Sequence, residues 1–227
     1  MDQLTTTSRP DFSVLGRSAD EELVNAITHG IGLALAAVGS LVMMTAATNV
    51  GNDRLAIGCA AYLFTLVAVY AMSTVSHTVT SPKRRMLFRQ LDQGFIFLLI
   101  VGTYTPFSVA YLHGAFWNVL LAFMWCFAMA GFASKAIFAH RIETGSIIPY
   151  LFLGWMSIIA LPTIWQVAPP QVLGLIVAGG VCYTIGTFFL LNDTKVRHFH
   201  AAWHLWVIAG STCHFMGLLL YTVQNHA

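Results

Sequence analysis

The chain has 227 residues, of which 57% are hydrophobic and 9% are charged, and its mean hydropathy is +0.73. A soluble domain carries about 25% charged residues, so this composition excludes a soluble globular protein and indicates an integral membrane protein. The formal net charge of +2 is too small to suggest a nucleic-acid partner.

Seven apolar stretches follow one another along the chain, each close to the roughly twenty residues that cross a bilayer. They predict an all-α fold, a bundle of seven transmembrane helices at about Leu23–Thr48, Leu55–Thr78, Leu87–Leu112, Phe116–Phe138, Ser146–Val167, Val172–Leu191 and Ala201–Val223. A polar N-terminal tail, residues 1–20, precedes this transmembrane domain of residues 21–227. The first apolar stretch is full length, so we expect an uncleaved anchor and no signal peptide.

Prolines, glycines and cysteines within these stretches add local expectations. Three prolines are expected to kink their helices or to leave a carbonyl free: Pro106, Pro149 and Pro162. Three glycines of the sixth stretch are expected to allow close helix packing: Gly179, Gly180 and Gly186. The cysteines form no close-spaced motif, and we interpret them as packing residues without disulfides: Cys59, Cys126, Cys182 and Cys213.

The distribution of cations predicts the orientation of the bundle. In a seven-span chain the N-terminus and the second, fourth and sixth connections share one side, and ten of the eleven Lys and Arg residues lie there. Arg54 alone lies on the other side. The positive-inside rule therefore puts the N-terminus in the cytoplasm and the C-terminus outside. The basic run 83–85 with Arg89 is mainly a topology signal in this interpretation, and binding of anionic lipid headgroups is an alternative.

Three histidines predict a metal site. His77 lies near the end of the second span, and His200 and His204 lie at the start of the last. The i, i+4 spacing of the last two places both imidazoles on one helix face, a turn apart. Intramembrane histidines are rare, and three neutral imidazoles leave the fourth position of a tetrahedral Zn²⁺ site for water. Imidazole also binds other first-row metals, so the identity of the metal stays open. The alternative to a metal site is a set of histidines that make hydrogen bonds between helices, with the HxxxH spacing arising by chance.

Further polar residues are expected at the same cytoplasmic depth. Asp92 would orient or deprotonate the attacking water, or act as a fourth ligand. Ser73, four residues before the first histidine, would polarise the water or a substrate carbonyl. Glu22, Asn25 and His29 form an i, i+3, i+7 stripe that suits support of the ligands from behind. For Glu22, a favourable charge at a helix N-terminus is the alternative interpretation.

The remaining histidines are interpreted separately from this set. His214 lies ten residues beyond His204, about 15 Å along a helix, and is interpreted as structural or as a support for the ligands. The other four fall in loops or the tail and are expected to be solvated: His113, His140, His198 and His226.

Several motifs stand in register along nearly the whole chain: Glu22-x-x-Asn25-x-x-Thr28-His29, Ser73-x-x-x-His77, Asp92 followed by Gly102-Thr103-Tyr104-Thr105-Pro106, and His200-x-x-x-His204 leading to Gly210-Ser211-x-x-His214-Phe215. On these motifs the chain resembles the hemolysin III and progestin/adipoQ receptor families. Its compact length and short loops are similar to the bacterial branch, which implies the inner membrane and a periplasmic C-terminus. Gln93 departs from the histidine expected after the aspartate in many bacterial relatives.

The resemblance also implies a function. Receptor members hold Zn²⁺ through histidines matching His77, His200 and His204, with an aspartate matching Asp92 near the zinc-bound water and a serine matching Ser73 nearby. They are linked to lipid-amide hydrolysis, the wider superfamily includes alkaline ceramidases, and bacterial members are associated with membrane-lipid and membrane-energy homeostasis. We therefore expect membrane lipids as partners and a zinc-dependent hydrolase of a lipid amide or ester. The alternatives are a non-enzymatic membrane-state sensor with structural zinc and, last, a pore or transporter. Substrate and oligomeric state stay open.

Overall fold

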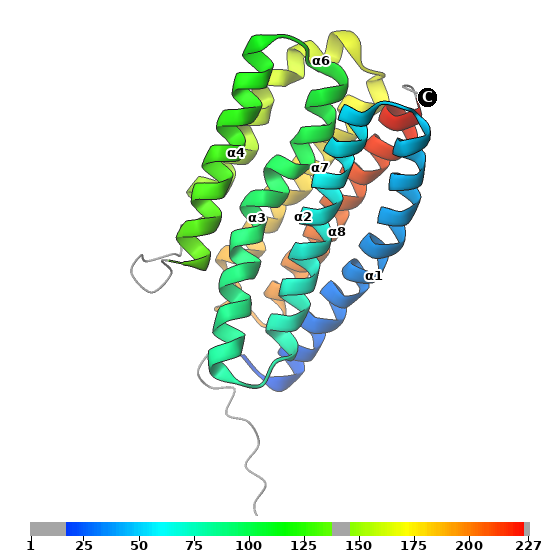
Figure 1. Cartoon of the computed structure of the whole chain (residues 1–227). Helices are drawn as coiled ribbons and strands as arrows, with labels where there is room; N and C mark the ends of the chain where they lie inside the picture. The colour runs from blue at the N-terminus through cyan, green and yellow to red at the C-terminus, as the bar shows by residue number, and fades with distance from the viewer. Residues whose placement is uncertain (1–16, 138–145, 225–227) are drawn as a thin grey trace, which may run out of the picture.

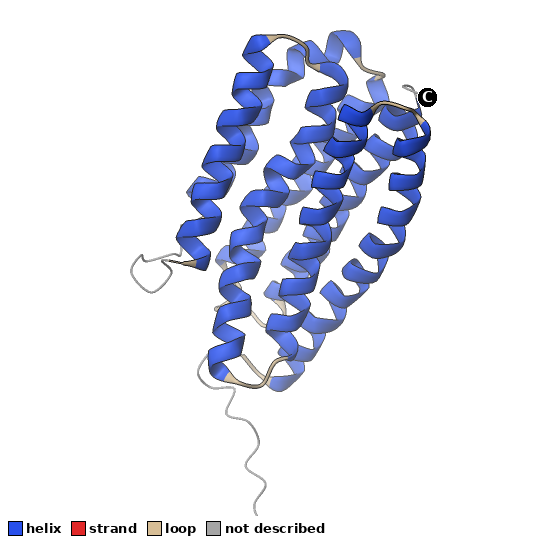
Figure 2. Ribbon diagram, in the orientation of Figure 1, coloured by secondary structure: helices blue, strands red, loops and turns tan. Residues whose placement is uncertain are grey.

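The computed structural model describes residues 17–137 and 146–224. These residues contain seven helical spans long and apolar enough to cross a membrane and no strand (Figures 1 and 2). The elements are α1 (Ala19–Asn49), α2 (Asp53–Thr78), α3 (Pro82–Tyr111), α4 (Ala115–Ala136), α5 (Ile148–Met156), the 3₁₀ turn η2 (Ser157–Ala160), α6 (Leu161–Val167), α7 (Pro170–Leu191), α8 (Phe199–Met216) and the π-helical η3 (Gly217–Val223). The predicted all-α seven-span bundle of a multi-pass membrane protein is confirmed.

The starts of the helices follow from local capping chemistry. Ser18 and Glu21 form a capping box at the start of α1, and the Asn52 side chain accepts the backbone N–H of Leu55 at the start of α2. α3 begins at Pro82, five residues before the predicted Leu87. Hydropathy placed that start too late because the basic residues of the first turn are polar, although lysine and arginine are good helix formers.

The fifth span is interrupted, and its prolines account for the pattern. Pro149 and Pro162 both lie within the fifth span, Ile148–Val167, as predicted, and they occupy the first turns of α5 and α6. A proline without an N–H is tolerated there, since the first-turn donors have no intrahelical acceptor. Pro106 does lie inside α3, which continues through it. The predicted end of the fourth span at Phe138 lies outside the described residues.

The helices form a ring in which the first and last elements are neighbours (Figure 1). α3 is the most buried span and packs against α2, α4 and α5. α8 packs against α7 on one side and α1 on the other, so the two ends of the sequence meet. Tightly buried side chains along this core include Met43, Tyr62 and Phe97. This arrangement brings the N-terminal turns of α1 and α8 together with the C-terminal turn of α2.

The predicted role of the α7 glycines is confirmed at two positions and wrong at the third. A Cβ atom on Gly179 would lie 2.4 Å from Nε2 of His214, and one on Gly186 would lie 2.9 Å from the Trp203 ring. A Cβ atom on Gly180 would have no described atom within 4 Å. Gly180 follows Gly179 by one residue and therefore points about 100° away, off the α8 interface.

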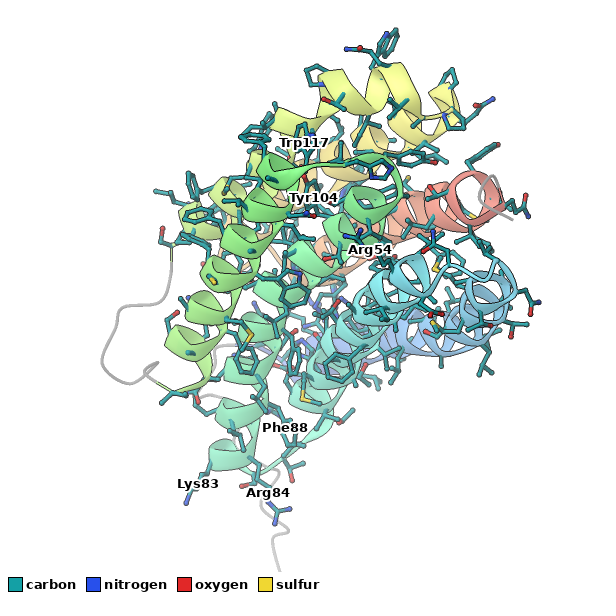
Figure 3. All side chains as sticks on the ribbon, turned by 45° about the horizontal axis from the view of Figure 1, so that its top comes forward. Arg54, Lys83, Arg84, Phe88, Tyr104 and Trp117 are labelled. Carbon is teal, nitrogen blue, oxygen red and sulfur yellow. The ribbon has the colours of Figure 1, made fainter. Side chains whose placement is uncertain are left out.

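The cations of the described residues separate between the two ends of the bundle. Lys83 and Arg84 lie at the start of α3, and Arg54 lies at the opposite end (Figure 3). Arg9 and Arg141, also predicted on the basic side, lie outside the described residues. The separation agrees with the charge asymmetry used above, and the cytoplasmic assignment stays a prediction. The four cysteines are free thiols.

Candidate metal centre

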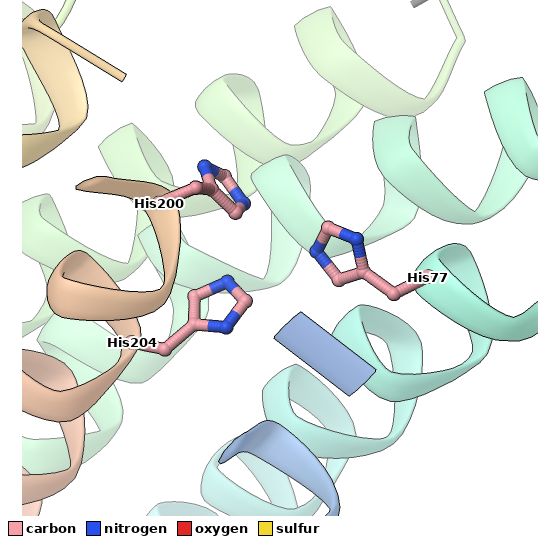
Figure 4. A group of neighbouring side chains, drawn as sticks. All are labelled: His77, His200 and His204. Atoms are coloured by element: carbon pink, nitrogen blue, oxygen red, sulfur yellow. The ribbon is translucent and has the colours of Figure 1, made fainter. Parts of the chain in front are cut away.

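Three imidazoles converge where α2 ends and α8 begins (Figure 4). One ring nitrogen from each of His77, His200 and His204 lies within 4.8 Å of the others. The ring centroid of His77 lies 5.2 Å from the ring centroid of His200 and 5.2 Å from that of His204. The His200 and His204 centroids are 4.5 Å apart. Zn–N bonds of about 2.0–2.1 Å in a tetrahedral site separate the nitrogens by roughly 3.4 Å, so modest side-chain rotations would close the group.

Carboxylates hold two of these rings through Nδ1. His77 Nδ1 lies 2.5 Å from Oε2 of Glu22, and His200 Nδ1 lies 2.7 Å from Oδ2 of Asp193. A carboxylate only accepts hydrogen bonds, which assigns the proton of each ring to Nδ1. The lone pair of each Nε2 is then free for a metal, and the carboxylate behind it fixes the ring orientation.

A hydroxyl holds the third ring in the same way. His204 Nδ1 lies 3.0 Å from Oγ1 of Thr28. The Thr28 hydroxyl gives its single proton to the carbonyl of Val24 or Asn25, so its oxygen accepts from the imidazole. All three rings thus use Nδ1 for an outer partner and leave Nε2 for a ligand. Each ligand of a three-histidine zinc site needs a neutral imidazole with one unprotonated nitrogen facing the ion, and these residues fit that requirement.

Glu22 lies at the centre of a buried charge network. Its second oxygen, Oε1, accepts a hydrogen bond from Arg89 at 3.2 Å and lies 3.8 Å from Nη1 of Arg85. The side chain is only 3% exposed. A carboxylate in this position would be costly without partners, and the two guanidinium groups compensate it. The sequence interpretation named Glu22 on the first span, but it predicted neither arginine as its partner.

Asp193 is a site residue that the sequence interpretation missed. It lies in the connection between α7 and α8, where it binds His200 and forms an ion pair with Arg17. Burial opposes the charge of Asp193, but the hydrogen bond with His200 and the guanidinium of Arg17 outweigh it and lower the pKa of this carboxyl. An acid seven residues before the HxxxH motif was the available signal, but it lies outside the apolar spans in which ligands were sought.

The other two residues of the α1 stripe occupy different positions. His29 stacks on His204 with a centroid distance of 3.5 Å and meets the Tyr70 ring edge-on at 5.2 Å. Neither His29 ring nitrogen has a hydrogen-bond partner, and the same holds for Nδ2 of the buried Asn25. His29 therefore supports a ligand by ring contact and also lines the cavity described below. Asn25 contributes its backbone carbonyl to the polar surroundings of His204.

Asp92 and Ser73 face each other across the α2–α3 interface, beside the histidines. The Asp92 carboxylate interacts with Ser73 and with Arg89. The Ser73 hydroxyl is fully buried yet makes no hydrogen bond of ordinary geometry. Asp92 is not one of the converging ligand atoms. Asp92 lines the same cavity as His77 and His200, whereas Ser73 lies behind it and is not among the lining residues.

An elongated cavity of about 820 Å³ begins at the candidate metal centre. At this end it is lined by His77, His200 and Asp92 together with Arg17, Arg89 and Asp193. It then runs between α3, α5, α6, α7 and α8 to His214, past mainly aliphatic and aromatic side chains. Polar groups at one end and an apolar length beyond suit an amphiphilic molecule.

The other histidines among the described residues do not join the ligand group. His214 is buried beside Tyr183, with a ring-centroid distance of 5.5 Å, and lies farther along α8. His113 and His198 are exposed, as expected. His140 and His226 lie outside the described residues. His198 has a left-handed backbone, with φ of 63°, and its N–H donates to Glu21 at the turn that leads into α8.

Comparison with known proteins agrees with this architecture. The chain matches the family described as haemolysin-III related over residues 17–215. It is 35% identical over 205 residues to hemolysin-3 of Bacillus cereus, covering 90% of this chain and 93% of the relative. It is 33% identical over 204 residues to a hemolysin-3 homologue of Bacillus subtilis, covering 90% and 95%. The chain therefore belongs to the haemolysin III family.

Proposed function

We propose that this haemolysin III family protein is a zinc-dependent hydrolase that cleaves an amide or ester bond of a membrane lipid. The observation that carries the proposal is the continuity between three converging histidines and an elongated apolar cavity. A lipid chain would lie along the cavity while its carbonyl group lies beside the histidines. Membrane lipids are then the partners, in the cytoplasmic leaflet of the inner membrane if the N-terminus is cytoplasmic.

In this proposal His77, His200 and His204 hold Zn²⁺ through Nε2. Bound zinc would act as a Lewis acid and would lower the pKa of water to about 7. Glu22 and Asp193 keep the Nδ1 protons in place and hold the rings in the binding orientation, which strengthens the imidazoles as ligands.

Asp92 and Ser73 would carry out the proton transfer and the stabilisation of charge. Asp92 would accept a proton from the attacking water and return it to the leaving amine or alcohol oxygen. The Ser73 hydroxyl, which has no ordinary hydrogen-bond partner, would donate to the substrate carbonyl oxygen as negative charge develops there. The apolar walls would exclude bulk water and strengthen both interactions.

A second candidate function is a non-enzymatic sensor of membrane state with structural zinc. It is favoured by the position of Asp92 outside the converging ligand atoms. Zinc would then connect α2 to α8 and, through Glu22, to α1. A pore ranks last, because the formally charged residues that line the cavity are all near the candidate metal centre: Arg17, Arg89, Asp92 and Asp193.

The first test is the metal content of detergent-purified protein. We expect about one zinc per chain in the wild type and in His113→Ala, whose histidine is exposed and distant, and loss of zinc in His200→Ala/His204→Ala. Plasma mass spectrometry on protein prepared without chelators measures this. Wild-type protein free of metal would contradict both zinc functions.

The second test is turnover of lipid amides and esters in mixed micelles, followed by release of fatty acid. We expect Asp92→Asn to keep its zinc and to lose at least about a hundredfold in rate, because the proton acceptor is removed. Asp53→Asn, an exposed acid at the start of α2, is the matched control. Turnover that survives in both Asp92→Asn and the double histidine variant would exclude the hydrolase. Zinc without turnover, with chelation lowering stability, would favour the sensor.

A further inference from the structure

We propose that Tyr104, Tyr183 and His214 form a second polar subsite in the wall of the cavity, which binds a neutral hydroxyl or carbonyl group carried part way along a lipid chain. This inference rests on the proposed function in one respect, since it takes the ligand to be a lipid. It adds a recognition element that is separate from the histidines that converge at the start of α8.

The three side chains come from three helices that surround the same cavity. Tyr104 belongs to α3, Tyr183 to α7 and His214 to α8, and all three line the cavity. His214 lies ten residues beyond His204, which is about 15 Å along the helix axis. The subsite is therefore well removed from the candidate metal centre but open to the same ligand.

Two of these side chains have polar atoms that lack an ordinary hydrogen bond. Nδ1 of His214 is fully buried without a hydrogen-bond partner, and the equally buried Tyr104 hydroxyl interacts with Ser108 but makes no hydrogen bond of ordinary geometry. The two residues are 6% and 7% exposed, respectively. Unpaired polar atoms are costly in an apolar interior, and this cost falls when a bound molecule supplies the missing partner. A cavity wall is the location from which such a partner can come.

The surrounding contacts hold these side chains in position. Tyr183 and Tyr70 both bind the Ser211 hydroxyl, at 2.9 and 3.0 Å, so one serine on α8 fixes tyrosines from α7 and α2. The His214 ring packs against Gly179 so closely that a Cβ atom there would lie 2.4 Å from Nε2. A fixed polar surface discriminates between ligands better than a mobile one, because less ordering is needed on binding.

The chemistry of the lining selects a neutral group. The formally charged residues that line the cavity lie at the other end, so a charged group beside His214 would have no counter-ion among the described residues. A hydroxyl both donates and accepts, and it can therefore pair with an imidazole nitrogen and a tyrosine hydroxyl together. The separation of about 15 Å between His204 and His214 along α8 corresponds to roughly ten to twelve methylenes of an extended lipid chain. Each C–C bond of about 1.5 Å advances such a chain by less than the bond length.

The experiment compares three fatty acids that differ in one hydroxyl: octadecanoate, 12-hydroxyoctadecanoate and 3-hydroxyoctadecanoate. Their carboxylates would lie at the cationic end beside Arg17 and Arg89. Binding to purified protein is measured through the fluorescence of Trp155 and Trp203, which line the cavity, at fixed detergent concentration. We expect the 12-hydroxy acid to bind about tenfold more tightly than the other two, the gain from one buried hydrogen-bonding group.

Variants then test whether the named residues cause the preference. Tyr104→Phe, which removes only the hydroxyl, and His214→Leu should abolish it while octadecanoate binds as before. Tyr62→Phe is the matched control, since Tyr62 is a fully buried tyrosine that binds the Ser211 carbonyl but does not line the cavity. This variant should keep the preference.

Each contrary result has a distinct meaning. Equal binding of all three acids to the wild type would overturn the subsite and leave the proposed lipid cavity standing. A preference that persists in Tyr104→Phe and in His214→Leu would also overturn it. Failure of every acid to bind would overturn the subsite together with the lipid-binding part of the proposed function. Because no turnover is measured, the result does not depend on whether the protein is a hydrolase.

Discussion

Glu22 illustrates how a single side chain can organise the candidate metal centre. One of its oxygens binds His77, and the other binds Arg89 beside Arg85. Replacing the carboxylate by an amide would leave two guanidinium groups facing a neutral side chain in a buried position. It would also weaken the acceptor that holds the His77 ring.

We expect Glu22→Gln to lower zinc affinity by about 10- to 100-fold, the usual effect of removing a carboxylate behind a metal-binding histidine. Competition with a chromophoric chelator on purified protein measures the change. Asp20→Asn is the control, because Asp20 lies two residues away on the same helix but is exposed and pairs with the exposed Arg197. Equal affinity of Glu22→Gln and wild type would show that this carboxylate does not support the ligand.

The sequence interpretation was uneven at this scale, for a physical reason. Glu22 was identified because helical spacing alone puts it on a face with Asn25 and His29. Asp193 was missed because its contact with His200 depends on the path of a short connection, including the left-handed backbone at His198. Spacing along a helix predicts shared faces, whereas the path of a loop depends on tertiary contacts.

At the level of elements, α7 and α8 show how closely two helices can approach when glycine lines the interface. Gly179 faces His214, whereas the adjacent Gly180 faces open space. We expect Gly179→Ala to destabilise the protein by about 1–3 kcal/mol through overpacking against the imidazole. Gly180→Ala should be neutral or slightly stabilising, since alanine favours helix more than glycine does.

Thermal unfolding of the two variants in detergent, side by side, tests this expectation. A lower melting temperature in Gly179→Ala alone is the predicted result. Equal melting temperatures would mean that the α7–α8 interface adjusts to the added methyl group. The sequence located the glycines on one helix, but it did not reveal which of them faces α8, because that depends on how the helix is rotated in the bundle.

For the whole molecule, the testable property is orientation. The described cations other than Arg54 gather at one end, so the positive-inside rule predicts a cytoplasmic N-terminus and a periplasmic C-terminus. An alkaline phosphatase fused to the C-terminus should be active, since the enzyme folds only outside the cytoplasm. The same fusion made after Lys135, at the end of the fourth span, should be inactive. The reverse pattern of activities would invert the assignment of the two ends.

The global architecture was the most predictable part of the protein. Seven apolar stretches of spanning length lead to seven helices, because an unpaired backbone is not tolerated in lipid. The sequence predicted that the histidine at the end of α2 and the pair at the start of α8 lie at the same depth. It did not predict that the two helices are neighbours, because depth alone does not determine which helices are in contact. The cavity could not be predicted, since it reflects how side chains from all eight α-helices fail to fill the space between them.

The contact between the first and last helices has a consequence for biosynthesis. Glu22 is made with the first span, whereas His200 and His204 belong to the last, 178 and 182 positions later. At about 5–20 residues per second, the early side chains wait roughly ten to forty seconds for their partners. In the proposed zinc protein, capture of the ion by all three histidines would therefore have to follow the arrival of the seventh span in the membrane. A nascent or truncated chain that lacks this span would not retain the ion, so under this proposal bound zinc would mark a chain whose assembly is complete.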